Sequence, residues 1–250
     1  MSHPKIAVIT LCRRMNAGGL IGRAKSIKNH VISKFPYDHL VFEDADGIRG
    51  SVASQVCDII PNARFINVWD NPTDNLKESH KAGSVIGYNG MCLFYAMEML
   101  HYLKDYDYYV RLDADCQLHS DLNIDNFINN GDIFGHSHKM LDNHKPTKLT
   151  LLPAIKEYID GNKINTLCSE KEINCWNYYN NFHITKLDFW RQKEVTDFLE
   201  YIYNQGGIRD HRWGDSTIQA NAVRMFCPKE KIIQLNDLKY RHDSHRWQNF

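Results

Sequence analysis

The 250-residue sequence contains no apolar run approaching the roughly 20 residues that a membrane-spanning helix needs. Its first apolar run, "IAVITL" at residues 6–11, is short and fits a buried strand better than the core of a signal peptide. The chain also lacks an excess of either charge, with 30 Lys and Arg against 30 Asp and Glu. A neutral chain gives no electrostatic reason to expect nucleic acid or an anionic membrane as the main partner. These absences predict a cytoplasmic protein without stable membrane insertion.

Paired cysteine motifs are missing as well. The seven cysteines are scattered and no two of them form a CxxC pair, so a structural zinc site is not expected. An odd, scattered set is typical of reduced thiols. No internal repeat, low-complexity block or linker divides the chain, so one domain over residues 1–250 is the simplest interpretation.

The first third of the chain alternates strand-like and helix-like segments. Strands are expected at 5–11, 38–44 and 64–69, with a helix ending near residue 34 and another at 51–60. This pattern predicts an α/β fold with a parallel sheet and helices on its faces. Ligands of such sheets bind beyond the carboxyl ends of the strands.

The remaining segments continue the pattern less regularly. A helix at 88–103 precedes a strand at 105–112, and an amphipathic helix at 192–205 ends before Gly206-Gly207. A further helix begins near residue 215, where Asp215 or Ser216 can serve as the N-cap. Other elements are expected as a helix at 151–160 and strands near 133–136 and 231–236.

Two carboxylates, Asp113 and Asp115, follow the strand in "DYDYYVRLDADCQL". They repel each other unless a cation lies between them, and Mg²⁺ or Mn²⁺ would leave coordination positions for phosphate oxygens. Nucleotide-sugar transferases hold a diphosphate in this way, with the metal stabilising the charge of the leaving group. The tripeptide is unspecific, however. A solvated loop is the alternative interpretation, and Asp44 and Asp46 form a second such pair after another strand.

Five blocks in the same order resemble glycosyltransferase family 15, the fungal-type α-1,2-mannosyltransferases. The chain has "SVIGYNGMCL" (84–93), "YDYYVRLDAD" (106–115) and "NFHITKLDFWR" (181–191) where the family has "GSVSYRHMCR", "YDYYWRxEPD" and "NFEIxxLDFFR". It has "GGIRDHRWGDSTIQANA" (206–222) and "NDLKYRHDSH" (236–245) for "GGFFYERWGDAPVHSIA" and "DDIGYYHPPF". The N-terminal "ITLCRRMNAGGLIGRAKSI" is similar more loosely.

The resemblance implies an α/β fold of the GT-A type, with a mixed, mostly parallel central sheet flanked by helices. Residues 1–115 would bind the nucleotide and residues 116–250 the acceptor. The implied reaction is a retaining transfer of mannose from GDP-mannose to a 2-hydroxyl of a glycan acceptor, with Mn²⁺ as the cofactor. Nucleotide sugar and glycan are therefore the implied partners.

The resemblance also assigns metal ligands. The family holds its metal with the acid of the "EPD" block and a histidine near the C-terminus, which match Asp113 and His242 here, and Asp115 matches the second acid of the block. A carboxylate with an imidazole suits Mn²⁺ better than Mg²⁺. Without the resemblance, His242 would be interpreted as a surface histidine in a polar tail.

Other matched residues would contact the substrates. Arg13 would contact the nucleotide or diphosphate, and Tyr88 matches a tyrosine near the sugar-transfer site. Asp215 would bind the acceptor or act as a base, while Arg212 and Trp213 would form an acceptor-binding wall. Each residue also has a structural interpretation: a solvated arginine, a half-buried tyrosine, a helix N-cap or a core tryptophan.

One catalytic position departs from the family. His183 stands where the family has the candidate nucleophile, the glutamate of "NFEI". A histidine cannot form the glycosyl ester of a carboxylate. Transfer would then run by front-face attack, or use another acid such as Asp215, or the chain would transfer a different sugar or bind without catalysis. Asn89-Gly90 in place of Arg-His, and Asp113 in place of Glu, are further departures.

The chain lacks the membrane anchor and stalk expected of a Golgi enzyme. It is therefore expected to be a cytoplasmic relative from a bacterium or a large virus, or a trimmed catalytic domain. A nucleotide-sugar- or glycan-binding relative without activity and a metal-dependent phosphohydrolase remain the alternative functions.

Overall fold

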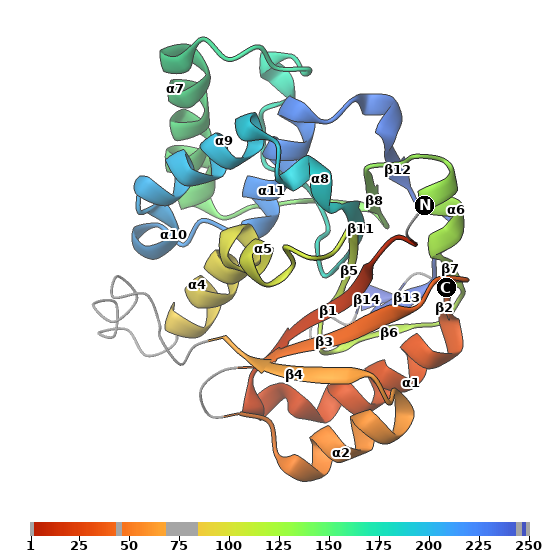
Figure 1. Ribbon diagram of the computed structural model, residues 1–250. Helices are drawn as coiled ribbons and strands as arrows, with labels where there is room; N and C mark the ends of the chain where they lie inside the picture. The colour runs from red at the N-terminus through yellow and green to blue at the C-terminus, as the bar shows by residue number, and fades with distance from the viewer. Residues whose placement is uncertain (1–2, 44–46, 69–84, 244–246, 249–250) are drawn as a thin grey trace.

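The computed structural model describes residues 3–43, 47–68, 85–243 and 247–248. Its centre is a seven-stranded sheet in the order β12-β8-β11-β5-β1-β3-β4 (Figure 1). Only β11 runs against its neighbours, since the pairs β8–β12, β5–β1, β1–β3 and β3–β4 are parallel. The expectation of a mixed, mostly parallel sheet is confirmed. The strands are β1 (Ile6–Cys12), β3 (Tyr37–Glu43), β4 (Ala63–Asn67), β5 (Tyr108–Leu112), β8 (Phe134–His136), β11 (Phe182–Lys186) and β12 (Ile232–Gln234). Asp44 and Asp46, the second carboxylate pair, lie outside the described residues.

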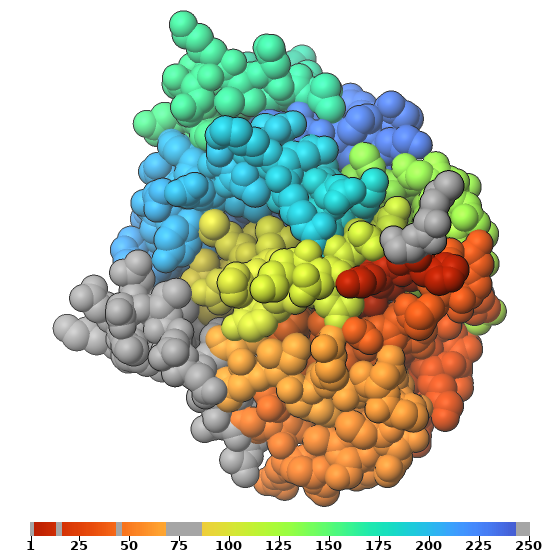
Figure 2. All heavy atoms as spheres, viewed as in Figure 1, coloured from red at the N-terminus to blue at the C-terminus, as the bar shows by residue number. Residues whose placement is uncertain are grey.

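Helices cover both faces of the sheet because its strands are apolar on both sides. In β1, Ile6 and Val8 pack into one hydrophobic core, whereas Ala7 and Ile9 pack into the other. The first core lies under α1 (Leu20–His30) and α2 (Gly50–Ile59). The second lies under α4 (Val85–Leu93), a π-helical turn (Phe94–Glu98), α5 (Met99–Tyr102), α7 (Leu152–Asn162), α9 (Lys193–Asn204) and α11 (Asp215–Phe226). In Figure 2 the yellow residues of α4 and α5 lie between the cyan residues of α9 and the orange residues of β4.

The remaining described elements are short. They are a 3-10 turn (Arg14–Gly19), β2 (Val31–Ile32), β6 (Cys116–Leu118), β7 (Leu122–Asn123), α6 (Ile124–Asn129), β9 (Lys139–Leu141), a π-helical turn (Thr147–Leu151), a 3-10 turn (Glu170–Glu172), β10 (Trp176–Tyr178), α8 (Leu187–Trp190), α10 (Gly207–Asp210), a 3-10 turn (Lys229–Lys231), β13 (Tyr240–His242) and β14 (Trp247–Gln248). Helix α1 ends four residues earlier than expected because β2 pairs with β7.

The C-terminal segment was expected to be a short polar tail that carries the metal-binding His242, and it returns to the middle of the fold. Strand β13 pairs antiparallel with β6, which follows the Asp-x-Asp segment directly, and β14 extends this small sheet. Its register places His242 opposite Cys116. The small sheet therefore brings a histidine from the end of the chain to Asp115.

A buried arginine, Arg23, stabilises the part of the sheet that leads to the Asp-x-Asp turn. Arg23 of α1 is fully buried, and its guanidinium donates hydrogen bonds to the carbonyls of Ile9 (2.9 Å) and Leu112 (2.8 Å) and contacts the imidazole of His39. Burial lowers the pKa of this guanidinium to about 10. Arg23 thus joins α1 to β1, β3 and β5 close to the ends from which the site residues emerge.

Gly19, at the start of α1, packs against the Asp-x-Asp turn. A Cβ atom added to Gly19 would lie 2.6 Å from the carbonyl oxygen of Ala114 and 3.3 Å from the Cα of Asp115. A Cβ atom on the neighbouring Gly18 would meet no atom within 4 Å. The backbone of the turn therefore lies against a position that only glycine fits.

Gly19→Ala is expected to lower the free energy of unfolding by about 1–3 kcal/mol, because the added methyl group must displace backbone atoms. Gly18→Ala is the matched control and should leave stability unchanged or raise it by about 0.4–1 kcal/mol. Urea denaturation measures both values. Equal effects of the two substitutions would contradict the close packing at Gly19.

Within the described part of the chain, burial holds four histidines neutral. Burial lowers the pKa of His136 and His138 to about 4, and lowers the pKa of His39 and His183 well below the ordinary value. Unfolding exposes these imidazoles, which then take up protons below about pH 6.5. The unfolded state therefore binds more protons than the folded state at mildly acidic pH.

The free energy of unfolding should consequently fall as the pH drops from about 6.5 toward 4, since linkage favours the state that binds more protons. His183→Gln removes one of these groups and should reduce the slope between pH 5 and 6 by about 1 kcal/mol per pH unit. Denaturant unfolding at a series of pH values measures the slope. An unchanged slope in the variant would show that His183 is not held neutral in the folded protein.

Candidate active site

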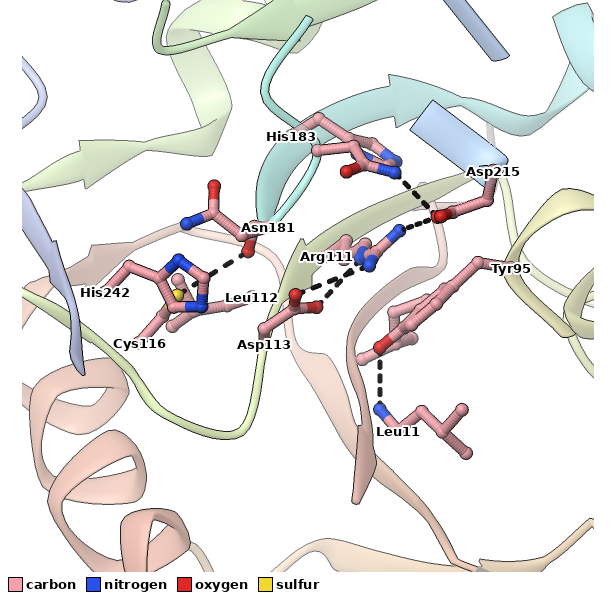
Figure 3. A network of polar contacts seen from close by, with 12 residues as sticks. Leu11, Tyr95, Arg111, Leu112, Asp113, Cys116, Asn181, His183, Asp215 and His242 are labelled. Carbon is pink, nitrogen blue, oxygen red and sulfur yellow. Dashed lines mark hydrogen bonds and ion pairs between the residues drawn. The ribbon is translucent and has the colours of Figure 1, made fainter. Parts of the chain in front are cut away.

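Arg111 lies at the centre of the polar cluster at the carboxyl end of β5 (Figure 3). Its side chain is only 2% exposed, and its Nε donates a hydrogen bond to Oδ1 of Asp113 at 2.9 Å. Its Nη1 donates to Oδ2 of Asp215 at 2.6 Å. The guanidinium also stacks on the ring of Tyr95, 3.3 Å from its centroid. One buried cation therefore joins two carboxylates that are far apart in the sequence.

The charges in this cluster depend on one another. Burial raises the pKa of Asp113, while the charge of Arg111 and hydrogen bonds from it act in the opposite direction. Burial also opposes the charge of Arg111, yet Asp113 and Asp215 raise the pKa of its guanidinium well above the ordinary value. Such a pair is maintained in a dry environment only when its hydrogen bonds are satisfied.

Asp215 emerges from the first turn of α11 and is 3% exposed. The helix N-cap is Gly214, and no side chain makes a capping hydrogen bond there, so Asp215 and Ser216 do not cap the helix as expected. Oδ2 of Asp215 instead accepts hydrogen bonds from Arg111 and, at 2.6 Å, from Nδ2 of Asn180. The carboxylate is thereby fixed beside the end of β5.

Asp115 and His242 meet on the other side of the cluster. Nε2 of His242 lies 3.3 Å from Oδ1 of Asp115, and its Nδ1 shares a 2.7 Å hydrogen bond with the hydroxyl of Tyr179. Fixing one ring nitrogen in this way orients the other toward a metal. Possible ligand atoms of Asp115, Cys116 and His242 all lie within 4.8 Å of one another. Carboxylate and imidazole groups fit Mn²⁺, so the residues present suit the expected ion.

Asp113 was expected to be a metal ligand, but its carboxylate pairs with Arg111. Both of its oxygens lie near Arg111, at 2.9 and 3.4 Å from guanidinium nitrogens. The group gathered around a possible metal position is therefore Asp115, Cys116 and His242, with Asp113 behind it. The sequence pattern contained no signal for the thiol in this group.

Two arginines and a tyrosine form the exposed rim. Arg13, directly after β1, lies with its guanidinium against Gly87 of α4. The guanidinium of Arg212 lies over the next residue, Tyr88, 4.0 Å from the ring centroid. Arg212 has a φ angle of 56°, a left-handed conformation that is strained for a side chain of this size. Burial raises the pKa of Tyr88, so its phenol stays protonated.

The expected acceptor contact of Trp213 is not supported. Its side chain belongs to the hydrophobic core and is 3% exposed. Its Nε1 donates a hydrogen bond to Oγ1 of Thr150 at 2.7 Å, and its ring lies against Gly207. Trp213 therefore holds α10 and the start of α11 together. Of the two residues expected to form an acceptor wall, only Arg212 is exposed.

His183 was expected at the reacting centre, and its burial contradicts direct contact with a substrate. It is 0% exposed and stands opposite Arg111 in the pairing of β11 with β5. Its Nε2 shares a 2.9 Å hydrogen bond with the hydroxyl of Tyr109, and its ring stacks on Phe134 with centroids 5.3 Å apart. It is a neutral core residue behind Arg111.

Five residues of the site were not expected from the sequence: Arg111, Tyr95, Asn180, Cys116 and Tyr179. Arg111 could have been found, because alternation along a strand places it on the same face as Asp113. The other four residues reach the site only through strand pairing and packing, which the sequence pattern does not show.

Comparison with known proteins identifies the family. The sequence profile described as glycolipid 2-alpha-mannosyltransferase matches residues 56–247. The glycolipid 2-alpha-mannosyltransferase of Saccharomyces cerevisiae is 27% identical, over 96% of this chain and 61% of that protein. Glycolipid 2-alpha-mannosyltransferase 2 of Candida albicans is 24% identical, over 95% of this chain and 58% of that protein. The chain thus spans about three fifths of the length of these relatives.

Solved structures share the fold. Core-mannan synthase A from Aspergillus fumigatus, in a Mn/GDP form, has a TM-score of 0.81 at 20% identity, over 96% of this chain and 75% of that chain. The mannosyltransferase Ktr4p of S. cerevisiae has a TM-score of 0.82 at 20% identity, over 96% of this chain and 70% of that chain. The expected GT-A fold is confirmed.

These findings correct the expected origin and location. The relatives are mannosyltransferases of fungi, so the expectation of a cytoplasmic protein from a bacterium or a large virus is wrong. Among the described residues, no helix has the length and apolar character to cross a membrane. The profile match covers more than half of the chain. The chain belongs to glycosyltransferase family 15, the family of the glycolipid 2-alpha-mannosyltransferases.

Proposed function

We propose that this protein transfers mannose from GDP-mannose to a hydroxyl of a glycan acceptor, as a retaining, Mn²⁺-dependent α-1,2-mannosyltransferase. One observation carries the proposal: the pairing of β13 with β6 delivers His242 to Asp115, next to the bridge from Asp113 through Arg111 to Asp215. The possible metal ligands Asp115 and His242 therefore lie close to Asp215 at the carboxyl ends of the strands, where α/β sheets bind ligands.

The possible metal ligands Asp115 and His242, together with the exposed Arg13, would hold the donor. Asp115 and His242 would hold Mn²⁺, with Asp113 close behind, and the ion would stabilise the charge of the departing GDP. Arg13 would pair with the diphosphate, since a guanidinium binds phosphate oxygens through two parallel hydrogen bonds. Residues 1–115 would thus bind the nucleotide together with His242, and the rest of residues 116–250 would bind the acceptor.

Asp215 would position the acceptor hydroxyl rather than attack the sugar. Its carboxylate already accepts hydrogen bonds from Arg111 and Asn180, which stabilise its charge and reduce its nucleophilicity. His183, at the position of the family's glutamate, is buried and neutral. Retention would then follow from front-face attack, with the leaving phosphate taking the proton of the acceptor hydroxyl. Tyr88 and Arg212 would line the path of the sugar.

His183 also favours a second function, the binding of a nucleotide sugar without transfer. Because no carboxylate stands at position 183, a protein that binds nucleotide sugars without transferring them would show the same side chains. Binding and turnover must therefore be measured separately.

Binding is tested by thermal unfolding. GDP with Mn²⁺ at about 100 times its dissociation constant should stabilise the protein by about 2.7 kcal/mol and raise the melting temperature by roughly 5–10 °C. Asp115→Asn should lose most of this rise, measured from its own baseline, because it removes a carboxylate that would hold Mn²⁺ beside His242. Asp243→Asn is the control, because Asp243 is exposed and pairs with Arg241. No rise with any nucleotide in the wild type would refute the proposal.

Turnover is tested by nucleotide release from a panel of nucleotide sugars, with methyl α-mannoside as acceptor and Mn²⁺ present. The fastest release is expected from GDP-mannose, and Asp215→Asn should reduce it by about 100-fold because the acceptor is no longer held. Asp210→Asn, which changes an exposed acid paired with Arg209, should leave it unaltered. A thermal shift without release from any donor would establish the binding protein instead.

A further inference from the structure

We infer that the thiol of Cys116 is a third donor at the metal position. It raises the preference of this site for thiophilic divalent ions such as Zn²⁺ and Co²⁺ over Mn²⁺ beyond what a carboxylate and an imidazole alone would give. The inference rests on the metal site of the proposed function, but not on the identity of the sugar. It arises from the grouping of Sγ of Cys116 with the ligand atoms of Asp115 and His242, all within 4.8 Å of one another.

The backbone enforces this grouping. Cys116 and His242 are direct partners in the antiparallel pairing of β6 with β13. Side chains of directly paired residues project from the same face of a sheet, with Cβ atoms about 5 Å apart. Figure 3 shows the sulfur of Cys116 beside the imidazole of His242. The thiol of Cys116 and the imidazole of His242 therefore lie on the same face of the small sheet, whichever rotamer each side chain adopts.

The distances suit a tetrahedral ion after a small movement. Bond lengths of about 2.3 Å for Zn–S and 2.0–2.1 Å for Zn–N place two ligand atoms of a tetrahedral site roughly 3.5 Å apart. Nε2 of His242 and Oδ1 of Asp115 are already 3.3 Å apart. The sulfur makes a weak hydrogen bond to the carbonyl of Asn181, at 3.8 Å, and little is lost when it turns toward the ion. The thiol proton would leave to solvent as the metal–sulfur bond forms.

The surroundings favour sulfur over Asp113 as the third donor. Both oxygens of Asp113 lie against Arg111, whose side chain is 2% exposed and cannot be left without its partner at low cost. Nδ1 of His242 is held by Tyr179, which fixes the orientation of the ring. A thiolate beside an imidazole and a carboxylate selects soft ions, whereas Mn²⁺ prefers oxygen and nitrogen. The alternative is that Cys116 is only a small core residue.

Cobalt distinguishes these possibilities, because Co²⁺ bound to sulfur shows a near-ultraviolet charge-transfer band while its visible bands report binding by any ligand. The metal-free protein, with a non-thiol reductant, is titrated with Co²⁺. We expect both sets of bands in the wild type. Cys116→Val, which nearly preserves volume, should keep the visible bands and lose the charge-transfer band. Its affinity for Zn²⁺ should fall roughly tenfold or more, and its affinity for Mn²⁺ should change less than about twofold.

Cys227→Val is the matched control, since Cys227 is also buried but contacts the carbonyl of Pro228 in the other core. It should retain both bands. Cobalt bound without a charge-transfer band in the wild type would overturn the inference even if Cys116→Val fails to fold, and so would a band that persists in Cys116→Val. If the wild type binds neither Co²⁺ nor Mn²⁺, the inference and the metal-dependent function fail together. If the expected bands appear but no nucleotide sugar is turned over, the inference stands and the proposed transfer fails.

Discussion

The buried guanidinium of Arg111 is the interaction on which the site depends. It pairs with the carboxylates of both Asp113 and Asp215, and its own side chain is only 2% exposed. Removing one partner of such a pair typically costs about 3–5 kcal/mol, because a buried charge is left alone. The position of α11 relative to β5 is therefore tied to the same contact that orders the acids. Tyr95 completes the arrangement with a ring against the flat face of the guanidinium.

A second constraint is the return of the chain end to the middle of the fold. Short strands such as β13 are marginal alone, and β13 is stabilised by packing on β6 and on the core beneath Tyr240. That packing decides which donors surround the metal position. The same pairing that supplies His242 also places a thiol beside it, which gives this relative a different set of donors from the acid and histidine expected from its family.

The fold was largely predictable because buried strands and amphipathic helices leave periodic apolar patterns. The segments that became β1, β3, β5 and α11 were recognised within a few residues, and Gly206 marks the end of α9 with a φ angle of 70°. The site was predictable only in part. Matched blocks pointed to Asp115, His242 and Asp215, which the structure brings to one cluster. They could not show that His183 and Trp213 are buried in the core, because a matched sequence pattern does not report side-chain exposure.

The sequence by itself determined the class of fold, the family and the set of acids and histidines from which a site could be built, since these depend on local periodicity and on matched motifs. Only the tertiary structure decided which of them meet. Arg111 reaches Asp215, and His242 reaches Asp115 and Cys116, through contacts between residues distant in the chain. Such contacts depend on strand register and helix packing, where a shift of one residue turns a side chain to the other face.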